Sequence, residues 1–362
     1  MNFLKKPIDT VKSVKESIAK FFEKVAATES FKRFVIVMRK FKQIFAEHSA
    51  FFALALLFVL AVILEGTTFL NVNNIMNILM NNAIVGIIAL GMTLIIISGG
   101  IDLAVGAQLA STGLIAITVM NHTHSIVLGI VVAIVAGVAM GFVTGVLIAK
   151  FQIPAFITTL GMMQIFRSVA QHFFSGGGIL VDRDYVGGFL TISNTRILNT
   201  ENFPGIPLPV IYWFSLCLII HVIATRTAFG RHIYAVGSNE RAARLSGINV
   251  DWVKIGVYMT SGALVVLASI VEASRLGSMN SSASGGAYEL QAIAAVVIGG
   301  TAMSGGKGKI SGTLFGMLTL GIINNMMNLM GFPSFLVAAI QGGIILLAVL
   351  LQRSVTTKEK KY

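Results

Sequence analysis

Amide and hydroxyl side chains recur inside stretches of this sequence that are otherwise apolar. Uncharged groups of this kind suit a neutral, polyhydroxylated solute, whereas a charged solute would favour residues of opposite charge. Amides in lipid are costly unless they find a partner or line a wet cavity. Two interpretations therefore stand: a solute path, or hydrogen bonds that join helices. The candidate path residues are Asn77, Asn81, Thr158, Thr159, Gln164, Asn324, Asn325 and Gln341.

The stretch Ser98–Gly106 combines two consecutive glycines with one carboxylate, Asp102. Gly99 and Gly100 permit a sharp break after an apolar stretch. Asp102 is then placed to cap the next helix, with its carboxylate accepting from backbone N–H groups. The structural interpretation is a tight turn between helices. The functional alternative is direct solute contact at a broken helix, so Asp102 joins the candidate path residues.

A polar loop over residues 225–253 contains a second candidate site. Ser238 or Asn239 can cap a short helix there, and Gly247 can end it. A helix this short is marginal in water and needs a docking surface. Its two adjacent alanines are small enough for close approach to another surface. The residues of this candidate contact are Ser238, Asn239, Glu240, Arg241, Ala242, Ala243, Arg244 and Gly247.

The sequence does not support nucleotide hydrolysis or metal chemistry by this chain. A phosphate-binding loop needs Gly-x-x-x-x-Gly-Lys followed by Ser or Thr. The candidate around Lys307 has Thr301 in place of the first glycine, and Gly308 follows the lysine. The six histidines and the single cysteine, Cys217, show no metal-ligand spacing. No pairing of a nucleophile with a base stands out, so we expect neither a catalytic nor a metal site.

The elements that position these residues follow from composition. The chain is 55% hydrophobic and 12% charged, whereas a soluble domain carries about 25% charged residues. Its mean hydropathy is +0.84, and apolar runs of roughly 20 residues, enough to cross about 30 Å of hydrocarbon, recur along it. We predict an all-α polytopic membrane protein with about ten transmembrane helices. The expected spans are 49–64, 75–98, 104–120, 125–149, 154–174, 208–224, 254–272, 290–303, 311–330 and 335–352.

The distribution of positive charge predicts the orientation of these spans. Ten crossings put both termini on one side of the membrane. With this arrangement 23 of the 27 Lys and Arg residues lie on that side and three on the other, while Arg167 falls within a span. The positive-inside rule makes the first side cytoplasmic. The net charge of +12 is thereby explained without a nucleic-acid partner.

The sequence divides into three expected parts. The first, residues 1–48, shows apolar stripes with lysines between them and predicts basic amphipathic helices on the anionic inner leaflet. The second, residues 49–352, is the transmembrane domain, in which residues 225–253 form a cytoplasmic loop. The third, residues 353–362, is a basic cytoplasmic tail. An inverted repeat is possible, because Pro154 and Pro333 each open a span after one that contains Gly-x-x-x-Gly.

Four motifs in order resemble a known family. They are Gly99-Gly100-Ile101-Asp102-Leu103, the run from Ala235 to Ile248, Tyr288-Glu289-Leu290, and the glycine-rich run from Ile298 to Gly308. With them the sequence resembles the membrane permeases of bacterial ABC importers for ribose, galactose and related monosaccharides. The resemblance covers roughly residues 50–352 and specifies the family more than the sugar. The long basic N-terminus departs from the family's shorter leaders, so no function is carried over to it.

The resemblance implies several partners and a location. Such a permease is a multi-pass protein of the bacterial cytoplasmic membrane and works as a dimer with a second copy or a paralogue. A cytoplasmic ABC ATPase would bind ATP and Mg, so this chain would need no cofactor, and an extracytoplasmic sugar-binding protein would deliver the solute. The segment from Glu240 to Gly247 is similar to the coupling helix that fits a groove on the ATPase.

Two kinds of alternative remain at this point. Within the family, the solute could be a nucleoside or a furanosyl signalling molecule. Outside it, an ion-coupled secondary transporter usually places acids within its spans. Residues 104–174 contain no acid, and Asp102 and Glu272 lie at span ends, which disfavours ion coupling. A membrane enzyme would need convergent titratable groups, which the sequence does not show.

Overall fold

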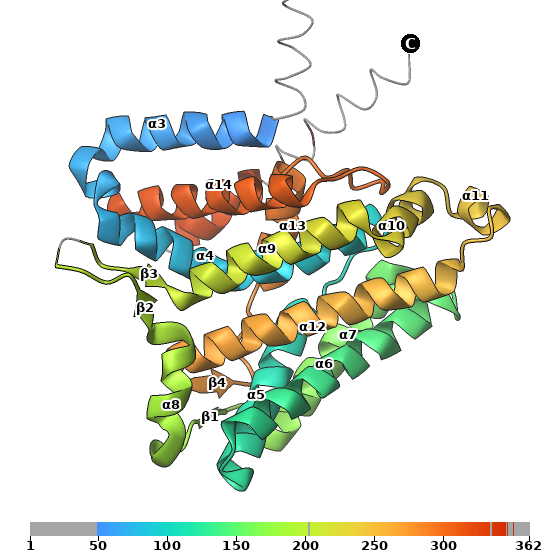
Figure 1. Cartoon of the computed structure of the whole chain (residues 1–362), viewed down its shortest axis with the longest axis horizontal. Helices are drawn as coiled ribbons and strands as arrows, with labels where there is room; N and C mark the ends of the chain where they lie inside the picture. The colour runs from blue at the N-terminus through green and yellow to red at the C-terminus, as the bar shows by residue number, and fades with distance from the viewer. Residues whose placement is uncertain (1–48, 202, 334, 345, 347–349, 351–362) are drawn as a thin grey trace, which may run out of the picture. The chain divides into compact units, whose positions relative to one another are not determined.

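The computed structural model describes residues 49–201, 203–333, 335–344, 346 and 350 (Figure 1). The chain divides into two units after Phe52, and apart from the first four residues of α3 the features below belong to the second. The surface helices expected in residues 1–48 and the tail expected over 353–362 lie outside the described residues and stay predictions.

Helices make up most of the described chain, as the alternation of long apolar runs with short polar turns predicts. The long helices are α3 (Ser49–Leu70), α4 (Val72–Ile97), α5 (Val105–Thr123), α6 (Ile126–Ala149), α7 (Ala155–Phe174), α9 (Leu208–Arg226), α12 (Val250–Leu276) and α14 (Ile310–Leu329). The shorter helices are α8 (Arg183–Asn194), α10 (Ala228–Ser238), α11 (Glu240–Leu245), α13 (Tyr288–Ile298) and Phe335–Ile344. The strands are β1 (Gly178–Leu180), β2 (Arg196–Ile197), β3 (Ile206–Pro207) and β4 (Ser278–Asn280).

Each expected span overlaps a helix, but the span 290–303 extends past the end of α13 at Ile298, and only residues 335–344 of the span 335–352 lie in a described helix. The helices also differ in length and hydropathy. Among the described residues, six are long and apolar enough to cross a membrane: α3, α4, α6, α9, α12 and α14. Helix α13 and the helix Phe335–Ile344 are apolar but shorter. The chain is therefore a mostly helical, polytopic membrane protein. The count of ten crossings, the inverted repeat and the side on which the termini lie remain predictions.

Helix α12 is the central packing element and runs alongside α6 (Figure 1). Small residues allow this contact, because a Cβ atom added at Gly137 would overlap the Val266 side chain and one at Gly141 would overlap the Tyr258 carbonyl oxygen. Close approach through glycines is a usual means of helix association in lipid, where packing replaces the hydrophobic effect. The Gly-x-x-x-Gly of α6 thus faces α12, and that of α14 faces α13 at Gly299.

Helix α4 is the most enclosed of the six candidate spans. In its most apolar window 89% of the residues are buried, against 22% for α6 and 11% for α3, so the latter two expose most of their apolar side chains. The Thr93 and Thr313 hydroxyls, 2.7 Å apart, join α4 to α14 inside the protein. A two-stranded sheet of β1 and β4 links the end of α7 to the end of α12, with Gly178 paired to Asn280.

Candidate functional site

The loop between α9 and α12 folds into two short helices, α10 and α11, of which the capping residues predict α11 alone. The Asn239 side chain accepts a hydrogen bond from the Ala242 N–H at 3.0 Å and so caps α11. The chain leaves α11 through Ser246 and then Gly247, which takes a left-handed φ of 81°. Glycine tolerates this conformation at the end of a helix without steric cost.

Only one of the two adjacent alanines of α11 faces outward. Ala242 is exposed, whereas Ala243 is 4% exposed and packs into the core of its own chain. This corrects the expectation that both alanines are presented to another surface, because a six-residue helix lying on the protein has one outer side. That side also carries Leu245, a large apolar residue that is 90% exposed and that the sequence analysis did not single out.

Ion pairs hold α11 against the start of α12. Lys254 Nζ lies 2.7 Å from Glu240 Oε2, and Arg244 Nη2 lies 2.5 Å from Asp251 Oδ1 and 3.4 Å from Glu240 Oε1. Partial burial alone would raise the pKa of Glu240, but the hydrogen bonds and charges of Lys254 and Arg244 outweigh it and lower that pKa. The hydrogen bond to Asp251 raises the pKa of Arg244. Glu240 and Arg244 therefore brace the helix, whereas Arg241 is exposed.

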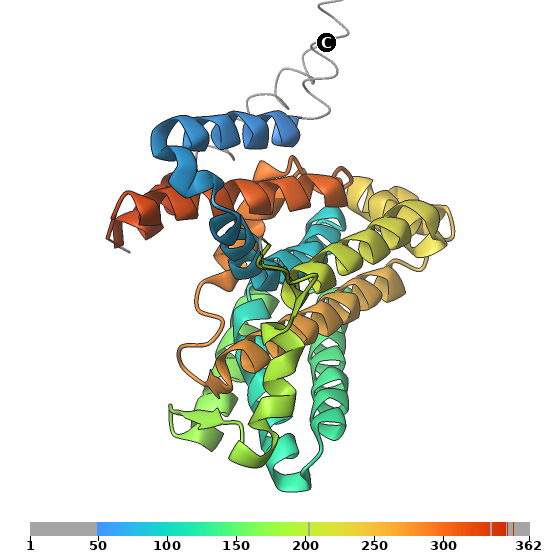
Figure 2. The same ribbon diagram turned by 60° about the vertical axis from the view of Figure 1, so that its left-hand side comes forward.

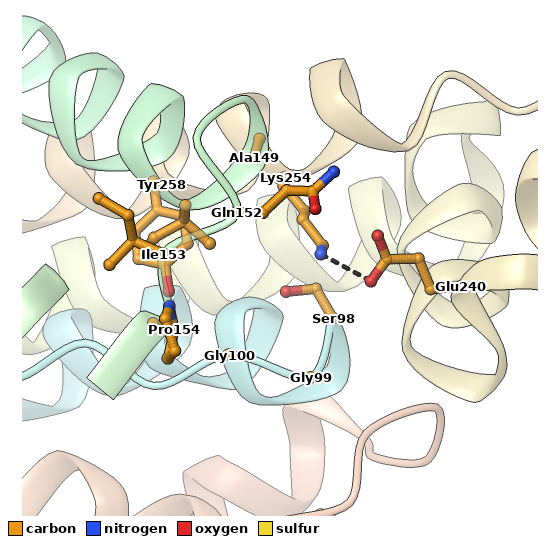
Figure 3. Close-up of a pocket in the computed structure, with 12 residues that line it drawn as sticks. Ser98, Gly99, Gly100, Ala149, Gln152, Ile153, Pro154, Glu240, Lys254 and Tyr258 are labelled. Carbon is orange, nitrogen blue, oxygen red and sulfur yellow. Dashed lines mark hydrogen bonds and ion pairs between the residues drawn. The ribbon is translucent and has the colours of Figure 1, made fainter. Parts of the chain in front are cut away.

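A cavity of about 280 Å³ lies beside this ion pair (Figure 3). Its wall combines the end of α4 at Ser98–Gly100, the α6–α7 turn at Gln152–Pro154, and the Glu240 and Lys254 side chains. Tyr258 of α12 completes the wall. The cavity thus joins α11 to the glycine turn that the sequence analysis singled out. Its lining offers hydrogen-bonding groups and one ion pair.

The carboxylate of Asp102, in the turn after α4, is hydrogen-bonded within the protein. Asp102 is 4% exposed, and its Oδ1 accepts from the Ala104 N–H at 2.8 Å. The expectation that Asp102 caps the next helix is wrong, because α5 begins at Val105 with Ala104 as its N-cap residue and no side-chain cap. Asp102 instead supports the turn just before the helix. The Tyr258 hydroxyl donates to the Ile101 carbonyl at 3.2 Å, which fixes the turn to α12. These contacts fit the structural interpretation of the turn.

The candidate path residues separate into two groups in the structure. On α4 and α14, the Asn74 and Asn325 amides bond to each other at 2.7 and 3.1 Å, and Gln341 Nε2 bonds to Asn324 Oδ1. Two further amides of α4 are exposed: Asn81, bound by Arg275 Nη2 at 2.6 Å, and Asn77.

The second group lies on α7. The Thr159 hydroxyl donates to the Ala155 carbonyl at 2.9 Å, Thr158 is buried, and Gln164 is exposed. Several of these polar groups thus have partners within the chain, whereas Asn77 and Gln164 face outward. Among the described residues, no group of three or more His, Cys, Asp or Glu side chains could hold a metal ion.

Comparison with known proteins supplies the family. Residues 74–349 match the family described as branched-chain amino acid transport system / permease component. The chain belongs to this permease family. No solved structure matches it.

Curated relatives include several sugar permeases. The chain is 42% identical over 303 residues to a ribose import permease of Escherichia coli strain K12, covering 82% of this chain and 91% of that protein. It is 41% identical over 300 residues to a ribose import permease of Bacillus subtilis, covering 82% and 90%. It is 33% identical over 360 residues to a xylose transport system permease of E. coli K12, covering 85% and 91%. These relatives confirm the family resemblance and do not favour an ion-coupled secondary transporter.

Proposed function

We propose that this chain is the translocating subunit of an ABC importer for a monosaccharide, with ribose as the first sugar to test. Its similarity to ribose and xylose permeases over more than four-fifths of its length supports this assignment. The chain is a non-catalytic subunit, and a separate cytoplasmic ATPase binds ATP and Mg. An extracytoplasmic sugar-binding protein delivers the solute, and a second permease copy or a paralogue completes the pair in the cytoplasmic membrane of a bacterium.

The observation that carries the proposal is the outer side of α11. Leu245 is 90% exposed on this six-residue helix and so presents an apolar side chain that a bound partner would bury. Ala242 beside it leaves room for a partner to approach the backbone. The ion pairs of Glu240 and Arg244, whose side chains are 43% and 45% exposed, tie the helix to the start of α12, so it is presented as a preformed contact. We assign this surface to the ATPase.

The contacts of α11 suggest how movement of the ATPase reaches the membrane helices. Glu240 is bound by Lys254, in the second turn of α12, and α12 packs against α4, α5 and α6. A displacement of α11 therefore acts directly on the most connected helix of the transmembrane domain. The glycine turn at Ser98–Gly100 lies across the same cavity and offers a second point where the movement can be taken up (Figure 3).

The solute path is assigned to the exposed amides of α4 and the half-buried amides of α14, together with the exposed Gln164 of α7. Neutral hydrogen-bonding groups suit sugar hydroxyls, and the two asparagine–amide pairs hold the walls at a fixed spacing. Residues 49–352 would form this translocating domain, and residues 225–253 its cytoplasmic coupling loop.

Substitutions on α11 test the assignment. Ala242→Trp places a large side chain on the outer side of the helix, and we expect the ATPase no longer to copurify with the permease and ribose uptake to stop. Arg241→Ala is the matched control, since a single ion pair at a wet rim contributes only about 0–1 kcal/mol. Full ATPase binding and normal uptake in Ala242→Trp would refute the assignment of this surface.

A further inference from the structure

One passage of the chain crosses the length of α12 without forming a continuous helix. After α12 ends at Leu276, the chain returns through β4, the non-helical residues 281–287 and then α13 (orange in Figure 2). In the turn that follows α13, the Gly306 N–H donates to the carbonyl of Ile97, the last residue of α4, at 2.8 Å. This contact lies beside the cavity lined by Lys254, so the turn reaches the opposite end of α12, where that helix begins. The 11 residues of α13 cover only about 16 Å, so an irregular segment covers the rest.

Gly285 lies level with the middle of the neighbouring helices, whereas Ser281 and Ser282 bond to the Gly177 and Gly176 carbonyls just after the end of α7. Gly285 faces Gly106, in the first turn of α5, so closely that a Cβ atom on either would overlap the carbonyl oxygen of the other. Two residues further along α5, Gln108 Nε2 donates to the Gly137 carbonyl at 2.8 Å. Gly137 in turn faces Val266, near the middle of α12. The part of the segment around Gly285 is therefore within the thickness that the membrane helices span.

Charged side chains from two helices hold this segment. Arg167 Nη1, on α7, donates to the carbonyl oxygens of Ser281 at 3.0 Å and Ser284 at 2.8 Å. On the other side, the carboxyl group of Glu272 on α12 is approached by the Ser284 and Tyr288 side chains. This arrangement supplies hydrogen-bond partners to a backbone that has left the helix, which is required at membrane depth. It also explains an arginine inside an expected span.

The segment also has an outer surface that the described chain leaves uncovered. Ser282, Ala283 and Gly286 are exposed. Non-helical backbone at membrane depth is tolerated where it is buried in protein or lines a water-filled cavity, and lipid contact is excluded. In addition, Glu272 is 4% exposed, yet its Oε2 has no hydrogen-bond partner among the described residues. A buried polar atom of this kind requires water or another polar group.

We propose that residues 281–289 line the solute path, that Glu289 contacts the hydroxyl groups of the solute, and that Arg167 is a positioning residue that holds the segment. Glu289 is half-buried in the first turn of α13, and its Oε2 lies close to Gly106 at the start of α5. A carboxylate accepts hydrogen bonds from sugar hydroxyls. The proposal rests on the function assigned above and adds a third wall to the path, which the amide pattern of the sequence did not indicate.

Thiol accessibility tests whether the segment is wet. Cys217 is buried, so a Cys217→Ala background carries single cysteines with little interference. We compare Ala287→Cys, an exposed position two residues after Gly285, with Val131→Cys, an exposed position on the apolar helix α6, in proteoliposomes that contain the full chain. A charged, membrane-impermeant thiol reagent should react with Ala287→Cys at least about tenfold faster than with Val131→Cys. Asn194→Cys, at an exposed end of α8, is the positive control for labelling.

Two results would refute the proposal that this surface is in contact with water. One is an Ala287→Cys chain as unreactive as Val131→Cys while Asn194→Cys labels fully. The other is a disulfide formed between the Ala287→Cys residues of two chains with uptake unchanged, since the segment would then be an interface between copies. Neither result depends on the ATPase or on the identity of the sugar, so neither bears on the role assigned to α11.

Uptake kinetics test the residue roles with ribose as the probe. Glu289→Gln should raise the KM for ribose uptake by about tenfold, the loss expected for a hydrogen bond to a charged group, with the maximal rate within about twofold of the parent. Arg167→Gln should lower the rate of ribose uptake. Arg167→Lys should restore part of that rate, because lysine still donates a hydrogen bond to a carbonyl. An unchanged KM in Glu289→Gln, with ATPase copurification intact, would refute solute contact at this residue.

Discussion

The substitution Leu245→Ala tests whether Leu245 binds a partner or stabilises the fold of its own chain. The side chain is 90% exposed, so its removal should change the free energy of unfolding of the permease by less than about 0.5 kcal/mol. If a partner covers it, three buried carbons are lost, at about 0.8 kcal/mol each, or roughly 2 kcal/mol of binding free energy. We therefore expect the ATPase to bind about thirtyfold more weakly, since 1.4 kcal/mol corresponds to a factor of ten.

The assay is a titration of the ATPase onto the permease held in lipid nanodiscs, with thermal unfolding of the permease measured in parallel. Arg241→Ala, on the same exposed helix, is the control and should bind within about threefold of the parent. A Leu245→Ala permease that binds the ATPase within twofold of the parent would refute the reasoning, because the exposed leucine would then have no partner on the ATPase. A lowered unfolding temperature would show instead that Leu245 packs within its own chain.

Three further outcomes follow from the structure. Ala243→Trp should lower the unfolding temperature of the permease itself, because overpacking a buried site typically costs about 1–3 kcal/mol. An unfolding temperature equal to that of the parent would contradict the burial of Ala243. The pKa of Glu240 is lowered in the folded loop, so its ionised carboxylate stabilises that loop. This stabilisation is complete at pH values above the ordinary glutamate pKa of about 4.3, and it is lost as the pH falls through the lowered pKa. Amide exchange of α11 should therefore be faster in Glu240→Gln than in the parent at pH 7, and this difference should vanish under strongly acidic conditions. Cysteines introduced at Ser354 and Asn194 should label from opposite sides of the membrane, and labelling of both from outside would contradict the topology.

The sequence by itself predicts the features that depend on neighbouring residues. Apolar runs mark the long helices because lipid requires a hydrophobic exterior and an internally bonded backbone. Asn239 and Gly247 mark the ends of α11, because capping involves residues only a few positions apart. The order of short motifs also indicates the family, which the comparisons confirm.

Only the tertiary structure decides which side of a short helix is free and which distant groups meet. Ala242 and Ala243 are chemically identical, and their different burial depends on how α11 lies on the core. Lys254 binds Glu240 from 14 residues away, and Arg167 binds carbonyls more than 100 residues away. No spacing along the chain encodes such contacts, because they arise from the packing of whole helices. The wet face proposed for residues 281–289 emerges for the same reason, since α13 alone resembles an ordinary short apolar helix until its neighbours are in place.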